Sequence, residues 1–332
     1  MPRIAGFRFR GRYTITMHMT QSKQSSLPAG FRLDDYTIVR ELSSGGFSQV
    51  YLALDHYDRK FAIKEYLPLD MTSRLPGGEV TIIDELDREA FRVGLKCFFE
   101  EARVLAGIQH PNIVRVVNFF RANSTVYMVM EYAEGRSLSK ELTLATGKLP
   151  EARLCKLFAE LIGGLREVHQ QQLLHLDIKP ANIYLRRNGS PVLLDFGAAR
   201  QALRRPGQAL ATMFTPGYAA PEQYDAKAAL GPWTDIYALG ASLYAMLGAG
   251  RLPSADERLR SDTLQPASLL FAKHYSAPLL ALVDACLQLD PQRRPRSLEQ
   301  MQQCLLANDY VTPQPPRSLW HRAGAWLAGK KG

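Results

Sequence analysis

The stretch His175-Leu176-Asp177-Ile178-Lys179-Pro180-Ala181-Asn182 decides how this sequence is interpreted. It places a carboxylate, an amine and an amide close together between two apolar runs. A carboxylate such as Asp177 can accept a proton from a hydroxyl group, and a lysine such as Lys179 can neutralise a phosphate. The amide oxygen of Asn182 can ligate a metal ion. The same stretch is compatible with a structural loop, so its interpretation depends on the segments around it.

Two segments upstream are compatible with phosphate binding. Leu42-Ser43-Ser44-Gly45-Gly46-Phe47-Ser48-Gln49-Val50 lies between two strand-like runs, and its small residues allow a hairpin to fold its amides over phosphates. An ordinary tight hairpin turn explains it equally well. Phe61-Ala62-Ile63-Lys64 places a lysine in an apolar strand, where a buried amine needs a carboxylate partner. A lysine at the edge of a sheet is the alternative.

Two segments downstream add a carboxylate and a rigid turn. Val192-Leu193-Leu194-Asp195-Phe196-Gly197 ends an apolar strand with the ligand type that a divalent cation prefers. Thr215-Pro216-Gly217-Tyr218-Ala219-Ala220-Pro221-Glu222 is rich in turn residues and suits a segment that holds a substrate chain. Either one alone is compatible with a structural loop. Five such segments in this order and at this spacing are not explained by unrelated loops.

Composition narrows the classes of function. Of the 332 residues, 46% are hydrophobic and 22% are charged, as in a globular protein and unlike a largely disordered one. No apolar run reaches the roughly 20 residues of a membrane-spanning helix, and the N-terminus lacks the apolar core of a secretion signal. The four cysteines form no C-x-x-C pair, which argues against a zinc knuckle or a disulfide framework and favours a reducing, cytoplasmic location.

The net charge of +9 is concentrated in the two ends of the chain. Residues 1–33 hold six Lys and Arg and residues 311–332 hold four, with no Asp or Glu in either stretch. The part between them therefore has 31 basic and 32 acidic residues, a net charge of −1. This distribution argues against nucleic acid as a partner of the body of the protein.

The pattern of apolar residues predicts a β-rich first half and a helical second half. Strands are predicted over 36–42, 50–54, 60–66, 114–119, 126–131 and 192–194, and helices over 91–108, 154–170, 234–247 and 279–287. Residues 67–90 are predicted to be irregular. We therefore expect an α+β fold with two lobes joined near 131–137.

The expected domain organisation is a body with two basic extensions. The body spans 36–308 and divides into an N-lobe over 36–132 and a C-lobe over 137–308. The boundaries of the extensions are 1–33 for a flexible N-terminal arm and 311–332 for a C-terminal tail.

The five segments together resemble the eukaryotic-type protein kinase superfamily, and specifically its bacterial serine/threonine kinases. Glu65-Tyr66-Leu67-Pro68, Phe98-Phe99-Glu100-Glu101-Ala102 and Gly135-Arg136-Ser137-Leu138 are also similar to that group. The resemblance covers residues 36–308 and implies a bilobal, protein-kinase-like fold. It also implies that ATP and Mg²⁺ are used to phosphorylate serine and threonine hydroxyls of protein substrates in a signalling role.

The resemblance implies the catalytic roles. Asp177 would orient or deprotonate the substrate hydroxyl, and Lys179 would stabilise the transferring phosphoryl group. Thr215 would bond to both of these side chains. Asn182 and Asp195 would hold Mg²⁺ on the phosphates.

Lys64 would bind the α- and β-phosphates of ATP and pair with a glutamate of the following helix. Glu101 lies nine residues before His110-Pro111-Asn112, as in the family, and four before the core position Leu105. Glu100 is the alternative, but its side chain would point about 100° away from that of Glu101 around the helix.

The remaining nucleotide contacts are implied in the same way. Met130 would be the gatekeeper, and Glu131–Ala133 would be the hinge that hydrogen-bonds adenine through its backbone. The expected ATP-binding residues are Leu42, Ser43, Gly45, Gly46, Val50, Ala62, Lys64, Glu101, Met130, Glu131 and Ala133.

Three further residues would support the site. Glu222 would pair with a late arginine, for which Arg294 fits best, and Asp235 would tie down the segment around Asp177. The chain also departs from the family. Ser43 and Ser48 replace the outer two glycines of the glycine-rich turn. Leu176 replaces the arginine that receives an activation-loop phosphate, which argues against activation by such a phosphate.

Two other classes of function stay open at this point. One is a catalytically inactive binding module, which the altered glycine-rich turn would allow and the intact Lys64, Asp177, Asn182 and Asp195 argue against. The other is a kinase-fold enzyme that phosphorylates small molecules, against which the rigid segment before Glu222 argues.

The C-terminal tail has a helical pattern of its own. Its apolar residues fall on one helical face beside basic ones, as in a helix that contacts a membrane surface or a partner weakly. A frayed basic tail is the alternative. The apolar residues are Leu319, Trp320, Ala323, Trp326 and Leu327.

Overall fold

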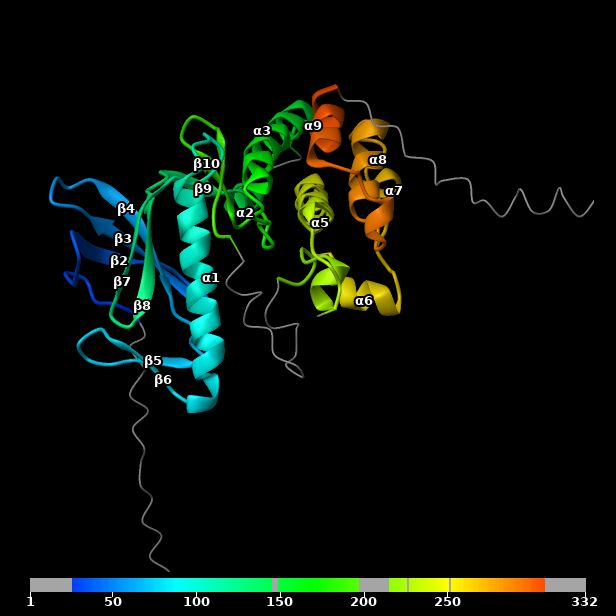
Figure 1. The fold of residues 1–332 in the computed structure, drawn as a ribbon. Helices are drawn as coiled ribbons and strands as arrows, with labels where there is room; N and C mark the ends of the chain where they lie inside the picture. Colours follow the sequence, from blue (N-terminus) through cyan, green and yellow to red (C-terminus); the bar gives the residue numbers. More distant parts are fainter. Residues whose placement is uncertain (1–25, 145–148, 197–214, 226, 251, 308–332) are drawn as a thin grey trace, which may run out of the picture.

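The computed structural model describes residues 26–144, 149–196, 215–225, 227–250 and 252–307. Strands dominate its first half and helices its second half (Figure 1). This confirms the predicted α+β fold with two lobes. The predicted tail lies outside the described residues. Among those that are described, no helix is both long and apolar enough to cross a lipid bilayer.

An antiparallel six-stranded sheet forms the N-lobe. Across the sheet the strands are β1 (Arg32–Leu33), β2 (Tyr36–Ser44), β3 (Ser48–Leu54), β4 (Lys60–Tyr66), β8 (Thr125–Glu131) and β7 (Val116–Ala122). β8 lies in the interior of the sheet, and all its residues except the last are buried, which explains its continuous apolar sequence. The register places Lys64 opposite Val50 on one side and opposite Met128 on the other.

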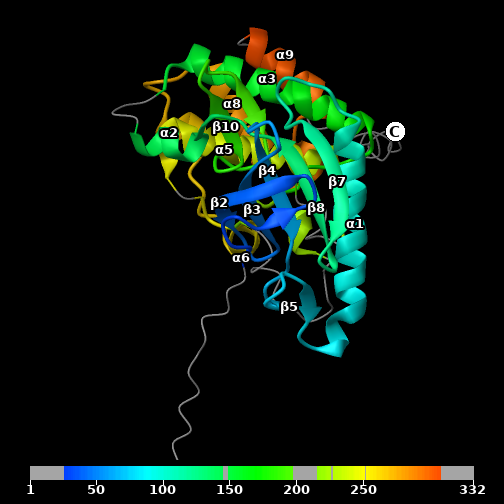
Figure 2. The same ribbon diagram turned by 90° about the vertical axis from the view of Figure 1, so that its left-hand side faces the viewer.

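The helix α1 (Arg88–Ala106) covers one face of this sheet and lies against β7 and β8 (Figure 2). It starts earlier than predicted because a turn over Glu85–Asp87, capped by Asp84, leads directly into it. The expected core face is buried, since Phe98, Ala102 and Leu105 are among its inaccessible residues.

On the opposite face of the sheet, the structure differs from the predicted boundary of the N-terminal arm. Its buried side chains on β3, β4 and β8 form a small apolar cluster that needs a cover. Residues 26–33 provide it, because Leu27 and Leu33 are only 3% and 2% exposed and β1 pairs with β2. The flexible arm predicted over 1–33 is therefore wrong for its last eight residues. Residues 1–25 lie outside the described part of the chain.

The segment between β4 and α1 is also more regular than predicted. β5 (Thr72–Arg74) and β6 (Val80–Ile82) pair as a short hairpin. At its turn Gly78 has φ 92°, and a Cβ there would lie 2.7 Å from the ring of Phe31. Strands of three residues are too short for a visible alternation of apolar and polar residues.

The C-lobe is built around α3 (Glu151–Gln170) and α5 (Pro232–Tyr244). Every residue of α5 from Thr234 onward is buried, and a helix that is apolar on all sides belongs in a core. The helix ends at Tyr244 rather than at residue 247, and a π-turn follows it. The other helices are α2 (Leu138–Leu144), α6 (Ala255–Arg260), α7 (Ala267–Leu270), α8 (Ala277–Cys286) and α9 (Leu298–Ala307).

A small sheet joins the connection between the lobes to the C-lobe. Its strands are β9 (Gly135–Ser137), β10 (Ile183–Arg186) and β11 (Pro191–Leu193), with β10 in the middle. Gly135 lies opposite Arg186, and a Cβ on Gly135 would lie 2.0 Å from the carbonyl oxygen of Leu185. Only glycine therefore allows these strands to approach so closely.

Candidate active site

The segment 175–182 lies between α3 and β10, and Asp235 of α5 holds its beginning. The buried carboxylate of Asp235 accepts hydrogen bonds from the amides of His175 (2.9 Å) and Leu176 (2.8 Å). His169 Nε2 lies 2.8 Å from the same carboxylate. Burial alone would raise the pKa of Asp235, but the hydrogen bonds from His169 and His175 outweigh burial and lower it. The predicted role of Asp235 in tying down this segment is confirmed.

Leu176 adopts an unusual backbone conformation. Its φ is +63°, in the left-handed region that branched and bulky residues rarely occupy. Asp235 holds its amide, and the Gln223 side chain donates to its carbonyl oxygen at 3.0 Å. The surrounding structure therefore imposes this conformation, which turns the next residue, Asp177, towards its partners.

His175 is wholly buried and links two loops. Its Nδ1 accepts a hydrogen bond from the amide of Asp177 (3.2 Å), and its Nε2 lies 2.9 Å from the carbonyl oxygen of Leu194. Nδ1 as acceptor and Nε2 as donor define a neutral ring. Burial lowers the pKa of His175, which agrees with this neutral state. The ring also packs on Phe196, with centroids 4.4 Å apart.

Three of the predicted site residues converge on the carboxylate of a fourth, Asp177. Lys179 Nζ lies 3.1 and 3.0 Å from the two carboxylate oxygens of Asp177 and donates to Thr215 Oγ1 at 2.7 Å. Thr215 Oγ1 in turn donates to Asp177 Oδ1 at 3.2 Å. The amide nitrogen of Asn182 donates to the carbonyl and to the carboxylate of Asp177 at 2.8 and 2.9 Å. The predicted contacts of Thr215 are thus confirmed.

Lys64 lies at a second convergence point. Its Nζ is 3.9 Å from Glu101 of α1, 3.5 Å from Asp195 and 3.4 Å from the carbonyl oxygen of Phe196. The side chains of Lys64 and Glu101 are 5% and 1% exposed, whereas Glu100 is exposed and pairs with Arg103. The structure therefore selects Glu101 over Glu100 and places Lys64 inside the sheet rather than at its edge.

The glycine-rich turn joins β2 and β3 next to Lys64. Ser43 lies opposite Val50 across the hairpin, and Gly45 donates its amide to the carbonyl of Ser48 at 2.9 Å. Gly46 is exposed, and its carbonyl accepts the amide of Leu69 at 3.0 Å. This turn is therefore fastened to the segment after β4. Leu42 lies in the same hairpin arm, two residues before the end of β2.

The other expected adenine contacts lie on β4, β8 and the connection that follows. Ala62 lies opposite Met130, so these two side chains are neighbours on the sheet. The amide of Glu131 donates to the carbonyl of Arg115 at 3.0 Å. An adenine contact through Glu131 would therefore use its carbonyl oxygen, and a contact with an acceptor on adenine would fall to the amide of Ala133.

The oxygen atoms at the site suit a hard divalent cation. Because the amide nitrogen of Asn182 is engaged by Asp177, the amide oxygen is the Asn182 atom that remains for a metal ion. Asp195 has φ +56°, and its side chain is 31% exposed beside Lys64. A carboxylate and an amide oxygen are ligands that Mg²⁺ accepts, so the residues fit the metal that the resemblance implies.

Glu222 and Arg294 form the predicted buried ion pair. Arg294 Nη1 and Nη2 lie 2.7 and 2.9 Å from the two oxygens of Glu222, in a bidentate arrangement. Thr234 Oγ1 donates to Glu222 as well, at 2.9 Å. The pair fixes the end of the segment that starts at Thr215.

Sequence reasoning missed two residues that support the site. Gln223 binds the carbonyl of Leu176, and His169 binds Asp235. His169 lies in the last turn of the amphipathic helix α3, and that position does not identify a partner.

Comparison with known proteins agrees with this geometry. Residues 36–306 match the family model described as the protein kinase domain. The serine/threonine-protein kinase pkn2 of Myxococcus xanthus is 32% identical over 288 residues, which are 82% of this chain and 32% of that protein. The serine/threonine-protein kinase Nek3 of Mus musculus is 29% identical over 86% of this chain and 52% of that protein. The chain thus spans about a third to a half of these two relatives.

Solved structures show the same fold. The structure titled PpkA-294 apo form has a TM-score of 0.76 and 35% identity, and the match covers 85% of this chain and 99% of that one. The PknI kinase domain of Mycobacterium tuberculosis has a TM-score of 0.62 and 23% identity over 85% of this chain and 98% of that one.

Proposed function

Because the chain belongs to the protein kinase domain family, we propose that it is a serine/threonine protein kinase that uses ATP. It would transfer the γ-phosphoryl group of ATP to serine and threonine hydroxyls of protein substrates. The observation that carries the proposal is the convergence of Lys179, Thr215 and Asn182 on the Asp177 carboxylate, with Lys64 paired to Glu101. The relatives named above are serine/threonine kinases, which supports the choice of acceptor.

In the proposed reaction the substrate hydroxyl oxygen bonds to the γ-phosphorus of ATP. The bond from that phosphorus to the bridging oxygen breaks, ADP leaves, and the hydroxyl proton goes to the carboxylate of Asp177. Lys179 Nζ, 3.0 Å from this carboxylate, is placed to neutralise charge on the transferring phosphoryl group. Lys64 would hold the α- and β-phosphates. The work of these residues is positioning and charge neutralisation.

Asn182 and Asp195 would hold Mg²⁺ against the phosphates. When bound, the ion would neutralise phosphate charge. The ammonium group of Lys64, 3.5 Å from the Asp195 carboxylate, supports a site for phosphate oxygens at this place. We propose that ATP is surrounded by the ATP-binding residues predicted from the sequence. Adenine would lie between Ala62 and the connection at Ala133.

A cytoplasmic location is part of the proposal. The four cysteines are free thiols in the structure, and two of them, Cys155 and Cys286, are buried. Unpaired buried cysteines are typical of proteins in reducing compartments. Protein substrates are proposed because the chain belongs to the protein kinase domain family. Their identity would come from phosphoproteomics that compares wild type with an Asp177→Asn strain.

The proposal is tested with purified full-length chain, labelled ATP, Mg²⁺ and a generic basic protein as substrate. We expect phosphoserine or phosphothreonine with the wild type and no transfer with Lys64→Ala or Asp195→Asn, because each removes a charge that acts on the phosphates or the metal. Asp177→Asn should lose most turnover with little change in ATP affinity, because Asp177 faces the hydroxyl. Lys156→Ala, which changes a lysine that is 79% exposed, is the matched control.

Three results would overturn the proposal. Activity near wild type in folded Lys64→Ala or Asp195→Asn protein would contradict the assigned site. Transfer to sugars or aminoglycosides but not to protein would indicate a small-molecule kinase. Nucleotide binding without transfer to any acceptor would indicate a binding module.

A further inference from the structure

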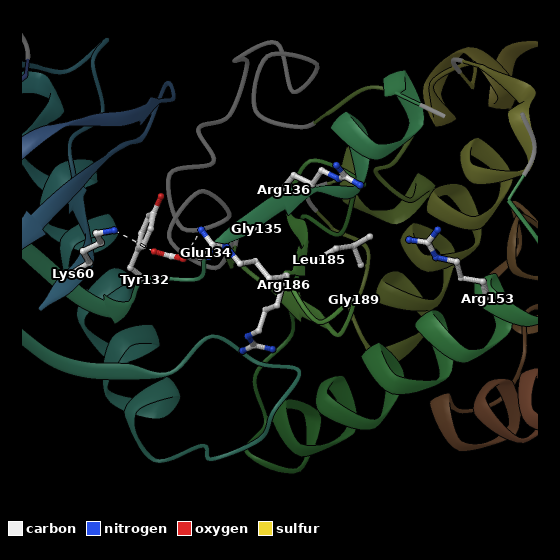
Figure 3. A pocket seen from close by; sticks show the side chains of 10 residues that line it. Lys60, Tyr132, Glu134, Gly135, Arg136, Arg153, Leu185, Arg186 and Gly189 are labelled. Atoms are coloured by element: carbon white, nitrogen blue, oxygen red, sulfur yellow. Dashed lines mark hydrogen bonds and ion pairs between the residues drawn. The ribbon is translucent and has the colours of Figure 1, made fainter. Parts of the chain in front are cut away.

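A basic groove runs along the outer side of the connection between the lobes. It contains a hollow of about 580 Å³, whose charged lining residues are Lys60, Glu134, Arg136, Arg153, Arg186 and Arg187. Figure 3 shows Lys60 and Tyr132 at one end of the hollow and Arg153 at the other, with Glu134, Arg186 and Leu185 between them. We refer to this hollow and its lining as the hinge groove.

The hinge groove is separate from the proposed transfer site. Its described lining residues include none of Lys64, Asp177 and Asp195. They come from β4, the connection after β8, β9, the start of α3, β10 and the turn after it. The β9–β10 register brings two of these elements together, because Arg186 lies opposite Gly135 and Arg136 opposite Leu185.

The hinge groove carries an excess of positive charge. Five cationic side chains line it, and two carboxylates, Glu134 in the lining and Glu141 behind it, pair with four of them. The local net charge is therefore +3, whereas residues 34–310 as a whole have a net charge of −1. An incoming anion would meet this local positive potential on a body that is otherwise close to neutral.

The carboxylates already present show which group the cations accept. Glu134 is held by Lys60 and Arg187, each at 3.1 Å, and these contacts together lower the pKa of Glu134. Glu141 is held by Arg136 at 2.5 Å and by Arg153 at 3.0 Å. Each carboxylate thus takes a pair of cations, which is the arrangement a ligand carboxylate would adopt.

Arg186 is the cation with the least neutralised charge. Within the described part of the chain its one hydrogen bond goes to the neutral carbonyl of Pro111, at 2.7 Å, and no carboxylate lies within ion-pair distance. The other arginines are about half exposed or more and keep further donors, because a guanidinium carries five.

The shape of the surface favours a chain segment over a single ion. Two further hollows adjoin the hinge groove: one shares Lys60 and Tyr132 with it, and the other shares Arg186 and Arg187. The cations are therefore spread along a continuous surface. A peptide with several acidic side chains can contact them together.

We propose that the hinge groove docks an acidic segment, rich in Asp and Glu, of the protein substrates. This rests on the proposed protein kinase function. Docking there would increase the local concentration of the substrate at the transfer site without any contact to the phosphorylated residue. The expected signature is therefore a KM effect that depends on the acidic segment.

Binding is measured first, because it does not require catalysis. Full-length Asp177→Asn protein is titrated into a fluorescein-labelled Glu/Asp octapeptide, with the matching Gln/Asn octapeptide as control, and anisotropy is recorded at low and at physiological salt. We expect the acidic peptide to bind at least tenfold more tightly. Arg136→Gln/Arg186→Gln should weaken this binding at least tenfold, while Glu141 keeps its contact with Arg153.

A matched control separates the groove from the basic ends of the chain. Arg92→Gln/Arg103→Gln removes the same charge from exposed positions of α1, where each arginine pairs with a glutamate three residues earlier. We expect this variant to bind as the parent does. Equal loss in both double variants, or no loss in either, would overturn the proposal, since binding would then depend on overall charge or on another site.

A second variant has an effect in the opposite direction. Glu134→Gln removes the internal carboxylate that competes for Lys60 and Arg187, so we expect it to tighten binding of the acidic peptide about threefold or more. A general loss of folding in the groove would weaken binding instead. Unchanged or weaker binding in folded Glu134→Gln protein would contradict competition for these cations.

Kinetics then distinguish docking from catalysis. With a serine peptide fused to the acidic octapeptide, Arg136→Gln/Arg186→Gln should raise KM at least fivefold and leave kcat within twofold, and without the octapeptide neither constant should change. Absence of transfer to every substrate with intact peptide binding would refute the proposed function but not the docking site. If a single-stranded oligonucleotide of equal charge binds the groove more tightly than the peptide, the occupant is nucleic acid and the proposal fails.

Discussion

The hydroxyl group of Thr215 joins two functional side chains that come from a different segment. It accepts a hydrogen bond from Lys179 at 2.7 Å and donates one to Asp177 at 3.2 Å. Because both partners are charged, each bond is stronger than one between neutral groups. Thr215 therefore holds the amine and the carboxylate in a fixed relation to the segment that would carry the substrate.

We predict that Thr215→Ala lowers kcat at least tenfold, which corresponds to about 1.4 kcal/mol in the barrier. Thr215→Ser keeps the hydroxyl and should stay within about threefold of wild type. The measurement is the initial velocity at saturating ATP with a protein substrate. If the serine variant is as slow as the alanine variant, packing of the methyl group rather than the hydroxyl bond explains the effect.

His175 gives the fold a dependence on pH. Burial lowers its pKa in the folded protein, whereas in the unfolded chain a histidine has a pKa of about 6.5. Below that pH the unfolded chain binds a proton that the folded protein does not. Stability contributed by neutral His175 is therefore present above pH 6.5 and lost as the pH falls from 6.5 towards the lower folded-state pKa.

We predict that between pH 7.5 and pH 5.5 wild type loses more unfolding free energy than His175→Asn, which cannot titrate, by up to about 1.4 kcal/mol. Urea unfolding at both pH values measures the difference. The same substitution at the exposed His274 provides the control for the loss of an imidazole as such. Equal pH dependence in wild type and His175→Asn would mean that the folded protein protonates His175 without cost.

Among the structural elements, the turn over Pro221–Tyr224 depends on one distant contact. The carboxylate of Glu222 in this turn accepts hydrogen bonds from both terminal guanidinium nitrogens of Arg294. The arginine side chain is 0% exposed. Removal of one partner would leave a buried charge without its counter-ion. The turn also carries Gln223, which binds Leu176, so its position matters for the site.

We predict that Arg294→Met lowers the unfolding free energy by about 3–5 kcal/mol. The double variant Arg294→Met/Glu222→Gln should lose about 2 kcal/mol or more less than the sum of the losses in the two single variants. Urea unfolding of the four proteins gives this coupling. The exposed pair Arg260–Asp256 is the control and should couple by less than about 1 kcal/mol. Strict additivity at Glu222 and Arg294 would show that their buried contact contributes no coupling.

At the scale of the whole molecule, two connections hold the lobes together. One is the chain after β8, where Glu134 bridges Lys60 of β4 and Arg187 beyond β10. The other is formed by residues 112–114 before β7, which exchange backbone hydrogen bonds with Leu193 of β11 at 2.8 and 3.1 Å. Lys64 and Asp195 then meet between the lobes at 3.5 Å. The expected phosphate and metal residues are thus brought together by both lobes.

The fold class could be predicted from the apolar patterns of the sequence, and the residues expected at the transfer site from its resemblance to the protein kinases. Alternating and helical apolar patterns predict most strands and the long helices, because these patterns reflect which face of each element is buried. The spacing within the segment 175–182 and the positions of Lys64 and Asp195 indicate phosphate chemistry, since charged groups so placed need a function or a partner. Glu101 could be preferred over Glu100 from the spacing that the resemblance implies together with the helical position of Leu105.

The contacts between segments far apart in the chain become visible only in the folded protein. Residues 26–33 cover a sheet face that their own composition does not reveal. Asp235 and Gln223 hold the left-handed Leu176 from two other elements. The cations of the hinge groove come from several separate segments with no common spacing. A sequence pattern encodes which face of an element is buried, but not which distant side chain lies against it, and that depends on the packing of the whole chain.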